Sequence, residues 1–294
     1  MKTLDHRDVR YVIITPVRDE QQYLRSTIEN VMAQTILPVE WVIVNDGSTD
    51  GTGDIIDDYA GRVPWIHAVH RSNRGFRKSG GGVVEAFNDG YNALRCPDWD
   101  FIVKLDGDLT FAPDYFGRCF EHFRNEPRLG IGGGDIYHDI CGDLKREVNP
   151  RFHVRGATKI YKRDCWKAIV KLWQGPGWDT IDEVKANMLG WNTQSFPELR
   201  LLHHRITGSA DGWWRDGVKH GLVCYISGYH PIFVAASCLY RLTRRPYILR
   251  SFSICFGFFK GYLTRVQRVN DTRLITYIRS QQLNRIYGRE TIWK

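Results

Sequence analysis

Two aspartates separated by one glycine, Asp106-Gly107-Asp108, are the most distinctive chemical feature of the sequence. They follow the mostly apolar run Phe101–Leu105, whose composition is typical of a buried parallel strand. Ligands of open α/β sheets bind beyond the carboxyl ends of the strands, where both carboxylates would lie. One could accept hydrogen bonds from a ribose or base, and the other could bind a divalent cation that carries phosphates. A hairpin closed by the Asp-Gly turn is the alternative interpretation.

Polar residues also follow two earlier apolar runs, Tyr11–Val17 and residues 40–44, which we predict to be buried strands. Strand and helix patterns alternate along the first half of the chain, which predicts an α/β fold with a doubly wound, mostly parallel sheet. The carboxyl ends of such strands meet at one edge of the sheet. We therefore expect one binding edge, at which the first two strands contribute Thr15, Pro16, Val17, Arg18, Glu20, Asn45 and Asp46.

A glycine-rich loop, residues 75–82, carries the cations Arg77 and Lys78. Its backbone N–H groups and cations could approach a diphosphate, although it lacks the Gly-Lys-Ser/Thr order of a P-loop. The alternative is a flexible connection without a binding role.

The second half of the chain offers a further set of acids and histidines. An aromatic, glycine-rich loop at residues 173–178 leads into three acids at a predicted helix start, a composition that suits a sugar as well as simple helix capping. A predicted strand at 199–205 ends in two histidines and an arginine, and adjacent strand residues point to opposite faces. Only one histidine can therefore point into a site. The three acids at the helix start are Asp179, Asp182 and Glu183, and the three residues at the strand end are His203, His204 and Arg205.

The composition of the 294 residues, 43% hydrophobic and 25% charged, is that of an ordinary globular protein with one large or two modest domains. Seven scattered cysteines without a Cys-X-X-Cys pair indicate reduced thiols in a cytoplasmic compartment. The charged N-terminal residues predict no signal peptide, and no apolar run approaches the ~20 residues that span a bilayer.

The C-terminal end is strongly basic, with 12 Arg/Lys against two acids between residues 241 and 294. Two short apolar runs, 232–240 and 248–259, are flanked by these cations. Such segments are typical of interfacial helices, so we predict that residues 231–268 bind an anionic membrane surface. Core helices packed on the catalytic domain are the alternative. No nucleic-acid-binding motif is present, and we expect no nucleic-acid partner.

Four ordered motifs resemble the family 2 glycosyltransferases of the GT-A fold. The resemblance extends over about residues 10 to 205 and leads us to expect a GT-A domain at 1–208, with a nucleotide-binding half at 1–112 and an acceptor half at 113–208. A basic, amphipathic helical region at 209–294 would follow. The motifs are Thr15-Pro16-Val17-Arg18-Asp19-Glu20, residues 42–52, Asn73-Arg74-Gly75 with residues 86–90, and Asp106-Gly107-Asp108.

The resemblance implies transfer of a sugar from a UDP- or GDP-type nucleotide-diphosphate sugar to a lipid-linked or growing glycan in cell-surface polysaccharide synthesis, and it favours an inverting reaction. It implies Mg²⁺ or Mn²⁺ bound by Asp108 with one of the two histidines, and a general base among the three helix-start acids. The remaining residues named above, with Asp106, Gly107 and Arg205, would bind the donor. The enzyme would lie in the cytoplasm, peripherally on the inner face of the cell membrane.

Two other classes of protein are weaker alternatives. A nucleotidyltransferase would usually carry a glycine-rich, basic signature after its first strand, where this chain has Arg18-Asp19-Glu20. A non-catalytic protein that binds anions or nucleic acid through the basic end would need metal at the strand-end acids, because these acids repel phosphate.

Overall fold

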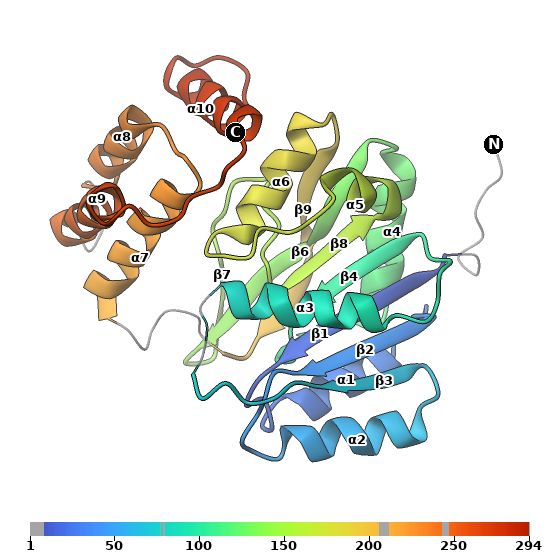
Figure 1. The fold of residues 1–294 in the computed structure, drawn as a ribbon. Helices are drawn as coiled ribbons and strands as arrows, with labels where there is room; N and C mark the ends of the chain where they lie inside the picture. Colours follow the sequence, from blue (N-terminus) through green and yellow to red (C-terminus); the bar gives the residue numbers. More distant parts are fainter. Residues whose placement is uncertain (1–8, 77, 79, 206–211, 243–246, 294) are drawn as a thin grey trace.

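The computed structural model describes residues 9–293 apart from 77, 79, 206–211 and 243–246 (Figure 1). Its described residues form one nine-stranded sheet with helices on both faces, and a group of C-terminal helices stands to one side. The chain therefore has the mixed α/β architecture that its strand–helix alternation predicts, followed by a helical C-terminal region.

Four neighbouring parallel strands make the first half of the sheet. Every residue of three of these strands, Tyr11–Val17, Glu40–Asn45 and Phe101–Leu105, is buried, as the mostly apolar runs predict. Val17 pairs with Asn45 in the register, so the polar residues that follow these two strands meet at one edge. In spatial order the strands are β3 (Ile66–His70), β2 (Glu40–Asn45), β1 (Tyr11–Val17) and β4 (Phe101–Leu105).

Helices cover the two faces of this sheet and bury a separate core on each. Because side chains alternate along a strand, Ile13 of β1 packs in one core while Val12 and Ile14 pack in the other. The first core contains residues of α1 (Leu24–Met32), α2 (Thr52–Arg62) and α4 (Tyr115–Asn125). The second contains residues of α3 (Gly81–Ala93), α5 (Arg163–Ile169) and α6 (Trp178–Met188).

The second half of the sheet is mostly antiparallel and overturns one sequence-based alternative. The hairpin alternative for Asp106-Gly107-Asp108 is wrong, because β4 pairs with β1 and β8 whereas the next strand, β5, pairs with β9. The strand that begins at Leu129 continues through the three glycines at 132–134 to Ile140. A Cβ on Gly134 would lie 2.2 Å from the Leu199 carbonyl oxygen, so close strand packing requires glycine there. These strands are β5 (Leu109–Phe111), β6 (Leu129–Ile140), β7 (Asp143–Arg146), β8 (Thr158–Lys162) and β9 (Asn192–His203).

Three of the C-terminal helices, α7, α8 and α9, form a small core of their own, whereas α10 shares a core with α6 of the α/β half. Helices α7 and α9 approach so closely that a Cβ on Gly221 would lie 1.9 Å from the Ile254 carbonyl oxygen, and one on Gly257 would lie 2.1 Å from that of Val218. Within the described residues, no helix combines the length and the apolar character that crossing a membrane requires. The helices are α7 (Gly212–Ile226), α8 (Pro231–Arg241), α9 (Tyr247–Thr264) and α10 (Thr272–Ile286).

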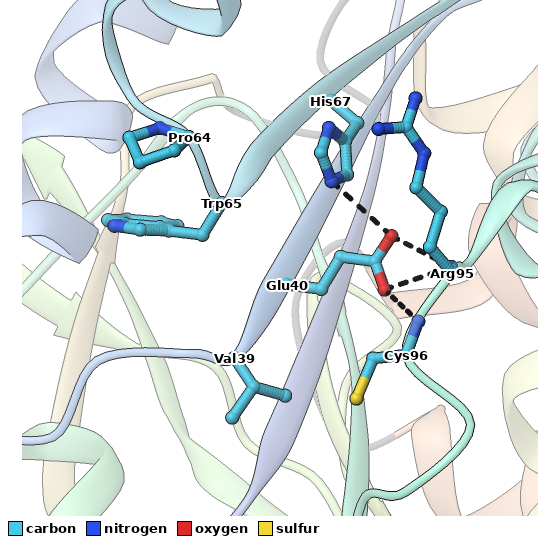
Figure 2. Close-up of a pocket in the computed structure, with 7 residues that line it drawn as sticks. All are labelled: Val39, Glu40, Pro64, Trp65, His67, Arg95 and Cys96. Carbon is cyan, nitrogen blue, oxygen red and sulfur yellow. Dashed lines mark hydrogen bonds and ion pairs between the residues drawn. The ribbon is translucent and has the colours of Figure 1, made fainter.

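A cavity lies at the opposite edge of the sheet, where the parallel strands begin, and the acid that lines it is Glu40 (Figure 2). The buried Glu40 carboxylate opens β2 and accepts hydrogen bonds of 2.7 to 3.0 Å from the backbone N–H groups of Arg95 and Cys96. The ring of His67 lies 3.6 Å from the same carboxylate. Glu40 therefore fixes the connection between α3 and β4, and its oxygens are already occupied.

Candidate active site

One cavity of about 670 Å³ lies at the carboxyl ends of β1 and β4 and collects residues from both halves of the sheet. Most of the residues predicted from the sequence line it. These are Pro16, Val17, Arg18, Glu20, Asp46, Lys78, Asp106, Gly107, Asp108, Asp179, His203 and Arg205. The predicted residues Thr15, Asn45, Asp182, Glu183 and His204 are not among its lining, and Arg77 lies outside the described residues.

Asp106, Asp108 and His203 form the acidic centre of the cavity. One donor atom from each of the three lies within 4.8 Å of the others. The Nε2 atom of His203 is 3.2 Å from Oδ2 of Asp108. Burial acts to raise the pKa of Asp108, but the contact with His203 and the nearby cations outweigh it and leave that pKa below its ordinary value. Two carboxylates and one imidazole form a donor set that a divalent cation accepts.

The two aspartates of this centre differ in their surroundings. The Nζ atom of Lys104 donates to Asp106 and to the Gly156 carbonyl oxygen. Burial nevertheless raises the pKa of Asp106, against the opposing charge of Lys104. Asp108 is thus the more readily ionised of the pair.

His204 points away from this centre. Its Nε2 atom is hydrogen-bonded to Oγ1 of Thr110 at 2.6 Å, and its ring stacks on Tyr23 with the centroids 5.3 Å apart. The alternation of adjacent residues at the end of β9 therefore places His203, and not His204, in the cavity.

Of the three acids at the start of α6, only Asp179 lines the cavity. Oδ2 of Asp179 lies 3.8 Å from the Arg155 guanidinium. Burial would raise the pKa of Asp179, but the positive charges of His153, Lys159 and Arg155 outweigh burial and lower it. A carboxylate held in its ionised form beside a cavity can accept a proton from a bound hydroxyl.

Asp182 and Glu183 belong instead to a buried ionic cluster centred on Lys159. The Lys159 Nζ atom lies 2.8 Å from an oxygen of each carboxylate and also donates to the Asp179 carbonyl oxygen. Glu183 further accepts from the Val154 backbone N–H at 2.7 Å and pairs with His153 at 2.8 Å. Burial raises the pKa of Asp182 to about 7. The cluster therefore anchors the first turn of α6, which carries Asp179.

The part of the cavity wall that follows β2 contains a carboxylate with two arginine partners, Asp46. The two terminal nitrogens of the Arg74 guanidinium donate to the Asp46 carboxylate at 2.7 and 2.6 Å, and Arg71 contacts this carboxylate as well. Arg18 donates to the Asp46 carbonyl oxygen at 3.2 Å. Arg205, which also lines the cavity, pairs with Glu20 at 2.8 Å.

Two predicted donor-binding residues stabilise the strand ends. The Thr15 hydroxyl accepts a hydrogen bond of 2.9 Å from the Trp41 indole N–H and is fully buried. The Asn45 side chain accepts one of 2.8 Å from the Ser48 backbone N–H, which closes the turn after β2. Both hydrogen bonds shape the edge of the sheet that carries the cavity.

Sequence reasoning did not single out several residues that line the cavity. Arg74 lies in one of the family motifs and Trp178 ends the aromatic loop, so both had a local signal. Lys104 and Arg155 had none, because their positions depend on the contacts between β4, β8 and α6. Lys219 comes from α7, so the C-terminal region also contributes to the cavity wall.

Carboxylates at the strand ends and a second acid, Asp179, line one cavity, an arrangement that is compatible with a glycosyltransferase. Residues 12–172 match the model of glycosyl transferase family 2, and the chain belongs to this family. It is 30% identical over 142 residues to the uncharacterized glycosyltransferase EpsJ of Bacillus subtilis (strain 168), covering 48% of this chain and 36% of that protein. It is 27% identical over 223 residues to the poly-beta-1,6-N-acetyl-D-glucosamine synthase of Staphylococcus aureus (strain COL), covering 68% of this chain and 51% of that protein. The matches thus span about half or less of the length of these two relatives.

Solved structures support the GT-A fold. The mannosyltransferase PcManGT from Pyrobaculum calidifontis, solved with GDP-Man and Mn²⁺, has a TM-score of 0.56 at 14% identity, covering 96% of this chain and 88% of that one. Residues 1–349 of S. aureus TarS, solved with UDP, give a TM-score of 0.51 at 16% identity, covering 73% of this chain and 65% of that one.

Proposed function

We propose that this glycosyltransferase moves a sugar from a UDP- or GDP-type nucleotide-diphosphate sugar to a lipid-linked or growing polysaccharide, with the help of a divalent cation. The observation that carries the proposal is the convergence of Asp106, Asp108, His203 and Asp179 on one cavity. The similar polysaccharide synthase supports a polysaccharide acceptor, and the neighbours solved with GDP-Man and with UDP support a nucleotide-sugar donor.

Asp108 and His203 would hold Mn²⁺ or Mg²⁺, with Asp106 beside them. Their oxygen-rich donor set with one imidazole fits such a cation, and a solved neighbour contains Mn²⁺. When bound, the cation would bind the diphosphate and stabilise its negative charge as it leaves. Arg205 is a protein cation in the same cavity that would bind the same phosphates through its planar, bidentate guanidinium.

The nucleoside would bind between the ends of β1 and β2, beside Asp46 and Arg18. Asp46 already accepts two hydrogen bonds from Arg74. Arg71 contacts the same carboxylate, so a ribose or base that uses it must share it with these arginines or displace them. Lys78 and Gly80 bring the glycine-rich loop to the same cavity, next to the expected diphosphate.

Asp179 would act as the general base. Its lowered pKa keeps it ionised, so it can take the proton of an acceptor hydroxyl while that oxygen attacks the anomeric carbon. The bond from the anomeric carbon to the diphosphate breaks as the new glycosidic bond forms, and the electron pair leaves with the nucleotide. A single displacement of this kind inverts the anomeric configuration. Trp178 also lines the cavity next to Asp179, although most of its side chain is buried in the second core.

Helices α8 and α9 would bind the enzyme to an anionic membrane surface on the cytoplasmic side. Residues 217–270 contain no Asp or Glu and eight Lys or Arg. Large apolar side chains of α9 are exposed at Ile248, Leu249, Phe252, Phe256, Phe259 and Leu263. Cations beside an exposed apolar helix face are typical of interfacial helices. Because Lys219 of α7 also lines the cavity, this surface would bring a lipid-linked acceptor close to the site.

A thermal-shift panel of UDP-, GDP- and dTDP-sugars with and without Mn²⁺ tests the donor and the cation together. A ligand at about 100 times its Kd should stabilise the protein by roughly 2.7 kcal/mol. We expect one nucleotide class to raise the unfolding temperature, more so with Mn²⁺, and the Mn²⁺ effect to disappear in Asp108→Asn. Equal unfolding temperatures across the whole panel would contradict the proposal.

A further inference from the structure

A second cluster of metal-ligating side chains adjoins the cavity. It consists of His138 on β6, Glu147 after β7 and His203 at the end of β9. One donor atom from each lies within 4.8 Å of the others. His203 belongs to both this cluster and the acidic centre, whereas His138 and Glu147 do not line the cavity.

His138 is buried between two hydrogen-bond acceptors. Its Nδ1 atom donates to the His203 carbonyl oxygen at 3.1 Å, and its Nε2 atom lies 2.7 Å from Oε1 of Glu147. A neutral imidazole carries a single N–H. With Nδ1 as the donor, Nε2 can reach the Glu147 carboxylate in two ways: through a second ring proton, as an ion pair, or through a cation bound to both atoms. Metal-bound histidines usually donate their other N–H to a carbonyl or carboxylate, which is the arrangement at Nδ1.

The other two members of the cluster also offer an available atom. The Nδ1 atom of His203 is buried and has no hydrogen-bond partner among the described residues, while its Nε2 atom faces Asp108. Oε2 of Glu147 forms an ion pair with Arg155, which leaves Oε1 toward His138. Ligating carboxylates are commonly held by such an outer partner.

We propose that His138, Glu147 and Nδ1 of His203 form a second cation site, selective for metals that prefer imidazole, such as Zn²⁺ or Co²⁺. Two histidines and one glutamate with a fourth position for water form a known ligand set for zinc, whereas the oxygen-rich centre at Asp106 and Asp108 suits Mn²⁺ or Mg²⁺. The inference depends on the proposed function only through the shared His203.

The shared histidine couples the two sites. A neutral imidazole has one lone pair, so His203 binds either a cation at Asp108 through Nε2 or one at His138 and Glu147 through Nδ1. Zn²⁺ at the second site therefore withdraws a ligand from the catalytic cation. Zinc should inhibit Mn²⁺-dependent transfer, and added Mn²⁺ should relieve the inhibition.

Metal titration of the purified full chain tests the site directly. Co²⁺ is followed by its visible absorption, Zn²⁺ by competition with a chromophoric chelator, and Mn²⁺ by its electron paramagnetic resonance signal. The variants are His138→Gln, which keeps a hydrogen-bonding side chain but removes a strong zinc ligand, and Asp108→Asn. His122→Gln is the matched control, because His122 pairs with Glu198 outside the cluster.

We expect His138→Gln to weaken Zn²⁺ and Co²⁺ binding at least tenfold and to leave Mn²⁺ binding intact. Asp108→Asn should have the reverse effect, and His122→Gln should alter neither. Glu147→Gln, a second variant of nearly unchanged shape, should reproduce the zinc loss if His138→Gln fails to fold. Equal zinc affinity in wild type, His138→Gln and Glu147→Gln would overturn the second site. Because the readout is metal binding, the result does not depend on whether the chain transfers a sugar.

Discussion

The sheet and the C-terminal helices differ in how far their apolar side chains are buried. In β1, β2 and β4 every residue is buried, and polar groups are concentrated where these strands end. In α9, by contrast, Phe252 is 68% exposed and Leu263 is 85% exposed. The first arrangement places polar groups together at one edge of the sheet, whereas the second leaves an apolar helix face exposed, as interaction surfaces do.

The two regions also differ in how their charges are balanced. Acids and cations of the cavity pair with one another, as in Asp46 with Arg74 and Glu20 with Arg205. Residues 217–270 contain eight Lys or Arg and no Asp or Glu, and Arg250 pairs with Asp216 just before this segment. The cavity is therefore suited to selecting a small charged ligand, and the helices are suited to a broad anionic surface.

The largest effect is expected in the cavity. Asp108→Asn should lower transfer on the order of 10³-fold, because an amide is a much poorer cation ligand than a carboxylate. Membrane binding should not change, since the substitution lies in the other region. The two quantities are measured by product formation and by co-sedimentation with liposomes. Transfer that survives and still responds to Mn²⁺ would remove Asp108 from the cation site.

The next comparison lies within α6, where Asp179 faces the cavity and Glu183 faces the buried cluster. Asp179→Asn should lower kcat by about 10²-fold or more and leave the donor KM and the unfolding temperature near wild type. Glu183→Gln should instead lower the free energy of unfolding by roughly 3 to 5 kcal/mol, because it leaves His153 without its carboxylate and leaves the buried Lys159 with Asp182 alone.

Steady-state kinetics and denaturant unfolding of both variants measure these outcomes. A large loss of kcat in a stable Glu183→Gln protein, with little change in Asp179→Asn, would exchange the two roles. In that case the cluster would contain the general base.

Exposed aromatics of α9 test the other region. Replacing Phe252 and Phe259 with serine should release much of the protein from anionic liposomes, since burial of a phenylalanine side chain contributes roughly 1.5 to 3 kcal/mol. Leu37→Ser, a change of an exposed residue in the α/β half, is the matched control. Nucleotide-sugar binding should remain in all three proteins. Wild type that stays in solution with every lipid would indicate a different partner for this face.

The electrostatic part of membrane binding has a separate test. Replacing Arg241, Arg244 and Arg245 with glutamine should weaken binding by about 1 kcal/mol for each cation, and salt should weaken it further. Arg244 and Arg245 lie outside the described residues. Flotation with neutral and anionic vesicles measures the effect, and equal binding to both vesicle types would argue against headgroup attraction.

The smallest effect concerns pH. Burial acts to lower the pKa of His153, but the Glu183 carboxylate outweighs burial and raises it. A raised pKa contributes stability that is fully present below about pH 6.5 and is lost as pH rises through the folded value. We therefore expect the free energy of unfolding to fall from pH 6 upward, by about 1.4 kcal/mol for each unit of the increase in pKa. His153→Gln should flatten this slope, and an unchanged slope would show that another group causes it.

The sequence by itself determined the parallel strands and the edge where they end. Their unbroken apolar runs require burial on both faces, and parallel strands connected by helices must collect their carboxyl ends together. The residue pattern alone was therefore enough to place Asp46, Asp106 and Asp108 at this edge. The family motifs indicated the class of enzyme, because each motif is a short run of neighbouring residues that can be recognised without the fold. The helices α8 and α9 could also be predicted from the sequence, because each contains a continuous apolar run.

Only the tertiary structure decided which of several equivalent residues reach the cavity. Asp179, Asp182 and Glu183 are alike in sequence, but Lys159 on β8 pairs with the last two and leaves the first beside the cavity. The choice of His203 over His204 likewise depends on how the end of β9 is oriented. Lys219 enters the cavity wall from α7, far along the chain from Asp108. Such long-range contacts leave no periodic signal, because each depends on the packing of elements that are distant in sequence.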